Sequence, residues 1–165
     1  MAKTRDQKKA IIEKLSASFK DAVSVVFVHF KGLNVAQESE MRRALGAANV
    51  TYTVAKKTLI GKAIESVKFG GEMPQLDGEI ALAFGKGDDS TAAARLVHEF
   101  GEKFKKAVAI VGGVFEGGFR DARGMTEIAT IPSMQVLRGM FAYVINSPRQ
   151  RFAVVLSKVA EAKAK

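Results

Sequence analysis

The sequence lacks cysteine and has few histidines and prolines, with two His and three Pro among 165 residues. Without thiols the chain can form no disulfide, no thiolate metal site and no cysteine nucleophile, a composition that fits a reducing compartment. No uninterrupted apolar run approaches the roughly 18 residues of a membrane span, and no signal-peptide core follows the first residues. We therefore expect a soluble, cytoplasmic protein that does not enter a membrane.

The polar residues show no pattern typical of an enzyme. His29 lies in an apolar segment and His98 in a helical one, so neither belongs to a paired metal-binding motif. The glycine pairs at 112–113 and 117–118 match neither a Walker phosphate loop nor a dinucleotide fingerprint, and we interpret them as turn residues. The carboxylates are scattered and form no acid–base pair. We expect no catalytic activity, no cofactor, no metal ion and no small-molecule substrate.

Positive charge is in excess, at a formal net +9, and it is unevenly distributed. Residues 1–70 carry 13 Lys and Arg against 6 Asp and Glu, residues 71–131 carry 7 against 10, and residues 132–165 carry 6 against 1. A basic front, an acidic middle and a basic tail indicate separate surfaces for separate partners. The sequence predicts a nucleic-acid-binding surface within the first 70 residues.

Strand-like and helix-like segments alternate over residues 1–131. Runs of β-branched and aromatic residues predict strands, and apolar residues at helical spacing predict helices between them. The predicted strands span residues 25–30, 50–54, 80–84 and 107–114, and the predicted helices begin near residues 5, 35, 58 and 91. We expect an α/β fold, with a globular N-terminal domain whose central sheet is flanked by helices. The sheet is expected to be mixed, because Gly117–Gly118 predicts an antiparallel hairpin.

Residues 132–165 are expected to form an extended C-terminal helical tail. A helix that starts after Ile131–Ser133 is predicted to stop at a hinge near Asn146–Pro148, where Ser147 and Pro148 favour a new helix start. That last helix carries an apolar stripe formed by Phe152, Val155, Leu156 and Val159. The stripe could fold back on the domain, bind helices of another chain, or lie on a membrane surface beside its basic face. The residues alone leave these alternatives open.

Lysines crowd the predicted junction between the second strand and the third helix. Lys56, Lys57 and Lys62 oppose the helix dipole, which favours an anion at a helix start. A phosphate backbone would resolve the conflict; a solvated lysine cluster on a basic protein is the alternative. Further cations precede the apolar stripe of the first helix, and Arg42 and Arg43 project from the second.

Five short motifs follow one another along nearly the whole chain. They are Lys31–Gly32–Leu33 with Val35 behind it, Glu40–Leu45, Val54–Leu59, Asp88–Leu96 and Ile131–Ser133. In order and spacing they resemble the bacterial large-subunit ribosomal protein L-ten family, at the base of the ribosomal stalk. Two departures occur: Lys57 stands where the family has Asn, and Gly78–Ile80 where it has Gly-Pro-Thr. Neither removes a charge from the expected RNA surface.

The resemblance implies a role for each part of the chain. Residues 1–131 would bind large-subunit rRNA beside ribosomal protein L-eleven. The last helix would carry dimers of the L-seven/L-twelve stalk protein, which recruit translational GTPases. Family members also bind their own messenger leader, so a sequence-specific RNA-binding regulator is the alternative function.

The residues that we predict to contact RNA combine the charge clusters with the family turn. They are Lys3, Arg5, Lys8, Lys9, Lys31, Gly32, Arg42, Arg43, Lys56, Lys57 and Lys62. The predicted partner-binding residues are Phe152, Val155, Leu156 and Val159.

Overall fold

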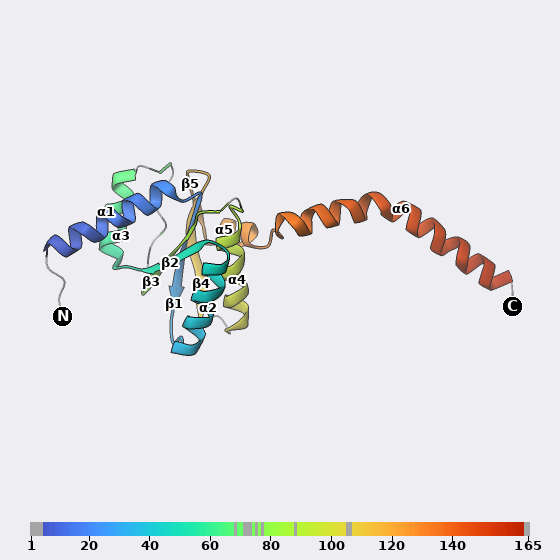
Figure 1. Ribbon diagram of the computed structural model, residues 1–165, viewed down its shortest axis with the longest axis horizontal. Coiled ribbons are helices and arrows are strands. Elements are labelled where there is room, and N and C mark those ends of the chain that lie inside the picture. The colour runs from blue at the N-terminus through green and yellow to red at the C-terminus, as the bar shows by residue number, and fades with distance from the viewer. Residues whose placement is uncertain are drawn as a thin grey trace. The chain divides into compact units, whose positions relative to one another are not determined.

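The computed structural model describes residues 5–67, 69–70, 74, 76, 78–87, 89–104 and 107–163. The chain divides into two compact units, Met1–Ile131 and Pro132–Lys165. The first unit holds a sheet and five helices within its described residues, and the second consists of one long helix (Figure 1).

Five strands form the sheet of the first unit. They are β1 (Ser24–Phe30), β2 (Val50–Val54), β3 (Ile80–Gly85), β4 (Val108–Phe115) and β5 (Gly118–Asp121). Their order across the sheet is β2-β3-β1-β4-β5, and every neighbouring pair is antiparallel. The four predicted strands and the predicted hairpin are confirmed. No end of a predicted strand differs from its observed position by more than one residue.

The α/β class is confirmed, but the expected mixture of strand directions is nearly absent. Within the described residues the parallel pairing is reduced to one isolated bridge between Gly70 and Gly118. Strands β1 and β2 do run parallel, as do β3 and β4, because the members of each pair flank a common antiparallel neighbour. This split βαβ arrangement explains the helical connections between them. The inserted strand is the feature that the alternation of elements did not predict.

Helices cover both faces of the sheet. The first face carries α1 (Arg5–Asp21) and α3 (Lys57–Val67), and the second carries α2 (Val35–Ala47), α4 (Ala92–Lys103) and α5 (Ala122–Ala129). Successive side chains of a strand point to opposite faces, so Val25 and Phe27 of β1 join the first core while Val26 and Val28 join the second. The continuous apolar runs of β1 and β3 therefore serve two hydrophobic cores.

Helix α5 was not among the predicted elements. It follows β5 directly, and the side chain of Asp121 accepts a hydrogen bond from the Gly124 N–H at 2.9 Å, which caps the helix start. Met125 and Ala129 are buried against the sheet. With only eight residues and an internal glycine, the segment carries little helical signal of its own.

The second unit contains a single helix, α6 (Met134–Lys163), where the sequence predicts two helices separated at Asn146–Pro148. Pro148 lacks the N–H that would donate to the Val144 carbonyl four residues earlier. The Ser147 hydroxyl donates to that carbonyl instead, at 3.0 Å. This bond satisfies the acceptor, so the helix continues through the proline and bends near its middle (Figure 1).

No single described helix is both long and apolar enough to cross a membrane, although α5 and α6 taken together reach that length and composition.

Candidate nucleic-acid interface

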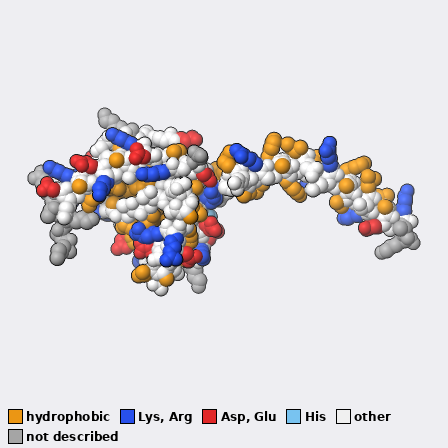
Figure 2. All heavy atoms as spheres, in the orientation of Figure 1, with side chains coloured by type: hydrophobic (Ala, Val, Ile, Leu, Met, Phe, Trp, Pro, Cys, Tyr) orange, Lys and Arg blue, Asp and Glu red, His pale blue; other side chains and the backbone are white. Residues whose placement is uncertain are grey.

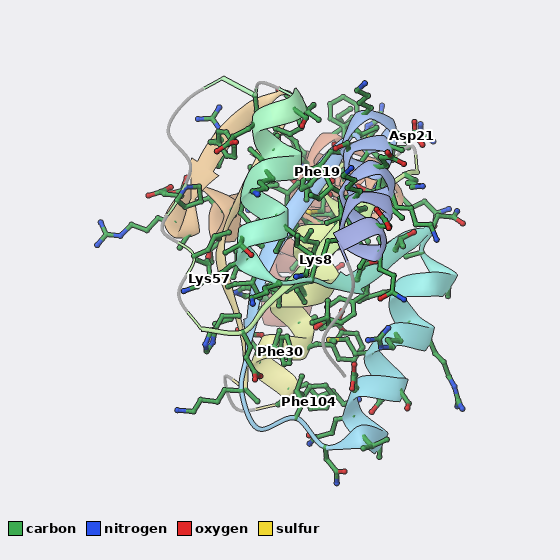
Figure 3. All side chains as sticks on the ribbon, turned by 90° about the vertical axis from the view of Figure 1, so that its left-hand side faces the viewer. Lys8, Phe19, Asp21, Phe30, Lys57 and Phe104 are labelled. Atoms are coloured by element: carbon green, nitrogen blue, oxygen red, sulfur yellow. The ribbon has the colours of Figure 1, made fainter. Side chains whose placement is uncertain are left out.

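A groove of about 1190 Å³ lies at the edge of the sheet where β1 and β2 end and β3 begins. Lys8 and Lys14 of α1 line one part of it, and Lys56 and Lys57 at the start of α3 line another. Its apolar lining includes Ile11, Leu15, Phe30, Val54, Leu59 and Ile80. Figure 3 shows Lys8, Lys57 and Phe30 on the same side of the domain. The groove therefore joins a cationic rim to an apolar floor.

The charge of the groove is strongly one-sided. Among the described residues, its ionisable side chains are the four lysines and a single carboxylate, Glu79. All four lysines are exposed, and none of them takes part in an ion pair within the described part of the chain. Four exposed ammonium groups around one concave surface attract a polyanion such as a phosphate backbone.

The start of α3 adds a fixed dipole to these charges. Strand β2 ends at Val54, and the Leu59 and Ile60 N–H groups donate to the Lys56 carbonyl at 2.8 and 3.1 Å, which closes the first turn. The leading N–H groups of a helix have no acceptor within it, and the first turn of α3 contains no acidic residue. The dipole and the lysines therefore favour an anion at the same place.

The Lys31–Gly32 turn follows β1 at the same edge of the sheet. The Lys31 N–H donates to the Ala107 carbonyl at 2.9 Å, which fixes the backbone, while the Lys31 side chain is exposed. Gly32 has φ +72°, a left-handed conformation that glycine adopts without strain. Only β3 separates the ends of β1 and β2, so the two ends lie about 10 Å apart at the usual strand spacing. One RNA segment can reach both.

Arg42 and Arg43 lie on α2, on the opposite face of the sheet. Arg42 pairs with Glu38 at 2.7 Å, and its guanidinium carbon lies 5.1 Å from the centre of the Tyr52 ring. Burial of Tyr52, together with the Glu38 carboxylate, raises the pKa of its hydroxyl to about 12, and Arg42 offsets part of that rise. Both arginines are exposed, but Arg42 makes these contacts within the protein. The groove includes neither.

The other predicted residues are dispersed. Lys9 and Lys62 are exposed without lining the groove. Arg5 begins α1 but its side chain is not described, and Lys3 lies outside the described residues.

The groove residues that the sequence prediction did not include are mostly apolar or small, but they also include Lys14 and Phe30. Lys14 shares a helix face with Lys8 and Ile11 at steps of three, so the periodicity of α1 could have identified it. Phe30 is the last residue of a continuous apolar strand, and no signal in the sequence distinguishes it from the other apolar residues of that strand. Its place in the groove follows from the edge position of the last strand residue.

A second surface runs along α6, none of whose described residues is buried. The predicted stripe is exposed, from 47% at Val159 to 66% at Phe152. The first half of the helix exposes a further apolar set, which comprises Met134, Val136, Leu137, Met140, Phe141, Tyr143, Val144 and Ile145. Figure 2 shows hydrophobic side chains along the helix, with basic ones among them. Exposed apolar surface of this extent is typical of interaction sites.

Comparisons with known proteins give a consistent result. Residues 3–108 match the family model described as Ribosomal protein L10. The large ribosomal subunit protein uL10 of Shouchella clausii is 37% identical over 163 residues, which cover 99% of this chain and 97% of that protein. The uL10 protein of Bacillus licheniformis is 32% identical over the same shares of the two chains. That of Rhodospirillum rubrum is 32% identical over 151 residues, 92% of this chain and 86% of the relative.

Proposed function

Because this chain belongs to the ribosomal protein L10 family and is a protein of the large ribosomal subunit, we propose that the groove between α1 and α3 binds large-subunit rRNA and that α6 carries dimers of the L-seven/L-twelve stalk protein. The family membership confirms the resemblance, and the relatives are named as ribosomal proteins rather than as enzymes. The groove with four exposed lysines at a helix start is the observation that carries the RNA part.

Phosphate contacts dominate the proposed RNA interaction. Lys56 and Lys57 sit at the N-terminus of α3, Lys8 and Lys14 face them from α1, and Lys31 extends the basic surface along the sheet edge. Each lysine that neutralises a phosphate releases counterions, so affinity falls steeply with salt. Ribosomal protein L-eleven is the expected neighbour on the same rRNA.

A matched pair of double variants tests this interface. Lys56→Ala with Lys57→Ala removes two groove charges, whereas Lys20→Ala with Lys86→Ala removes two exposed charges elsewhere. Lys20 lies about 18 Å along α1 from Lys8, and Lys86 follows the far end of β3. Binding of an rRNA fragment from the stalk base is measured between 50 and 200 mM salt. The groove variant should reduce the slope of log K against log salt by roughly 1.4 to 1.8, and equal slopes for the two variants would refute the assignment.

The apolar surface of α6 supports the partner role. It consists of two sets, residues 134–145 and 152–159, with the polar segment 146–151 between them. A 30-residue helix without a buried side chain has its apolar faces available for helices of another chain. From the family resemblance we expect two or three stalk dimers.

Truncation separates the two functions. A chain that stops after Asn146 loses the second apolar set, and one that stops after Ile131 loses both. Native mass spectrometry with the purified stalk protein should show fewer bound dimers for the first truncation and none for the second. Both should keep the rRNA affinity of residues 1–131. Retention of all dimers by the shorter chain would contradict the role of α6.

A further inference from the structure

The groove contains an aromatic ring that phosphate binding does not account for. Phe30 lines it among the four lysines, and Ile11, Val54 and Leu59 continue its apolar lining. Phosphate oxygens make no favourable contact with an apolar surface. A ligand that used only its phosphates would therefore leave the apolar lining of the groove exposed to water, which is unfavourable. The floor and the rim therefore suit different parts of one ligand.

Phe30 is held firmly in place. It is the last residue of β1, where it pairs with Val108 of β4, and its N–H donates to the Glu79 carbonyl at 3.3 Å. Phe30 packs against the hydrophobic core beneath α2 and α4, and it is only half-buried. The same residue thus lines the groove and is anchored by the core. A ring fixed in this way loses little entropy when a planar group stacks on it.

We propose that this groove takes an unpaired nucleotide of the RNA, with its base against Phe30 and its flanking phosphates on Lys8 and Lys57. This inference rests on the proposed rRNA binding and specifies what the groove recognises. Proteins that bind single-stranded RNA combine a cationic groove with an aromatic ring on which a base stacks. A volume of about 1190 Å³ exceeds the roughly 300–1,000 Å³ of typical ligand pockets, so a nucleotide with its neighbouring phosphates has room.

A paired RNA helix fits these features less well. Its bases are stacked on one another, and double-stranded RNA offers a protein mainly its 2′-hydroxyls and phosphates. Such a ligand would use the lysines and leave the ring of Phe30 without a partner. Bulges, loops and junctions present the splayed bases that a ring can accept.

The test uses the full chain and two RNA hairpins with the same stem, one fully paired and one with a single bulged uridine. The wild-type protein should bind the bulged hairpin about tenfold more tightly, since one stacked base contributes on that order. Phe30→Leu, which keeps an apolar side chain but removes the ring, should abolish this preference. Phe30→Tyr, which keeps the ring, should retain it. Phe30→Leu should leave the salt slope of binding unchanged, because it removes no charge.

Cross-linking gives a readout that needs no variant. With 5-iodouridine at the bulge, irradiation of the wild-type complex should attach the RNA to Phe30, as located by mass spectrometry of the digested protein. Absence of a bulge preference in the wild type, retention of it by Phe30→Leu, or a cross-link confined to residues outside the groove would overturn the proposal.

The lysine variant distinguishes this failure from that of the proposed function. If Lys56→Ala with Lys57→Ala loses affinity for both hairpins while Phe30→Leu binds both like the wild type, the groove binds phosphates but no base. If that lysine variant binds both hairpins like the wild type, the groove is not the RNA site and both proposals fail.

Discussion

Replacing Asp89 should destabilise the first unit through the start of α4. The Oδ1 atom of Asp89 accepts bonds from the Thr91 N–H at 3.1 Å and the Thr91 hydroxyl at 2.8 Å. Its Oδ2 atom accepts from the Arg95 guanidinium at 2.8 Å, and a second guanidinium N–H donates to the Thr91 hydroxyl at 3.1 Å. One carboxylate thus joins the turn before α4 to the first turn of that helix.

The magnitude follows from the bonds that each substitution removes. Asp89→Asn keeps an oxygen for Thr91 but loses the charge-assisted bond from Arg95, at a cost of about 1 kcal/mol for a partly exposed pair. Asp89→Ala removes every side-chain bond of this residue and should cost about 2 kcal/mol. For a unit of this size, 1 kcal/mol corresponds to roughly 3–5 °C in Tm. The Ala variant should therefore melt roughly 6–10 °C lower.

The pKa of Asp89 determines how its contribution to stability changes with pH. Burial of the Asp89 carboxyl raises its pKa, but the hydrogen bonds from Arg95 and Thr91 outweigh that effect and hold the pKa below its ordinary value. A group whose pKa is depressed on folding stabilises the protein above its unfolded pKa, about 3.9 for Asp. That stabilisation is lost as pH falls through the folded-state pKa. The difference in free energy of unfolding between the wild type and Asp89→Asn should therefore be largest near pH 7 and decrease below pH 4.

Urea unfolding followed by circular dichroism at pH 7, 5 and 3 measures this gap, with Arg95→Ala as the control that removes the same ion pair from its other end. A gap that stays constant down to pH 3, or an Asp89→Ala variant as stable as the wild type, would refute the reasoning.

Two further substitutions test packing and helix continuity. Gly113→Ala should lower the free energy of unfolding by about 2–3 kcal/mol, because an added Cβ would lie 2.4 Å from the Val25 carbonyl oxygen in β1. Gly46→Ala is the control in α2, where nothing lies within 4 Å of an added Cβ. It should raise the free energy of unfolding by about 0.5–1 kcal/mol. Urea unfolding measures both changes in the free energy of unfolding. Equal changes for the two variants would contradict the close packing of Gly113 against β1. Ser147→Ala removes the donor to the Val144 carbonyl, so amide hydrogen exchange around Pro148 should quicken by roughly three- to tenfold; unchanged exchange would show that the hydroxyl does not support the helix.

The sequence predicted the strands well because their signal is local. Each predicted strand is a short run of β-branched, aromatic or small apolar residues bounded by turn residues, and β1 and β3 are so continuous that both faces had to be covered. The order of the strands is not local, and the insertion of β3 between β1 and β2 leaves no trace in either strand. The helix through Pro148 was missed for a different reason. A serine followed by a proline is typical of a helix start. Here, however, the Ser147 hydroxyl donates to the Val144 carbonyl, the acceptor that Pro148 leaves without a backbone donor.

The predicted site shows the same division. Lys56 and Lys57 are neighbours in the chain and were found as a cluster. Lys8 and Lys14 join them only because α1 packs beside α3 on the first face of the sheet. The sequence therefore identified three of the four lysines, Lys8 among them, but only the packing of the helices shows that they line one groove.

The topology of the sheet explains why these pieces form one surface. Strands β1 and β2 are both antiparallel to β3, so both end at the same edge. A direct hairpin between β1 and β2 would have placed their carboxyl ends at opposite edges. Through the helical crossover, the turn at Lys31–Gly32 and the corner at Lys56–Lys57 instead flank the first residue of β3, Ile80. The conformation of each turn depends on its own residues, but their combination into one basic surface depends on the strand inserted between them.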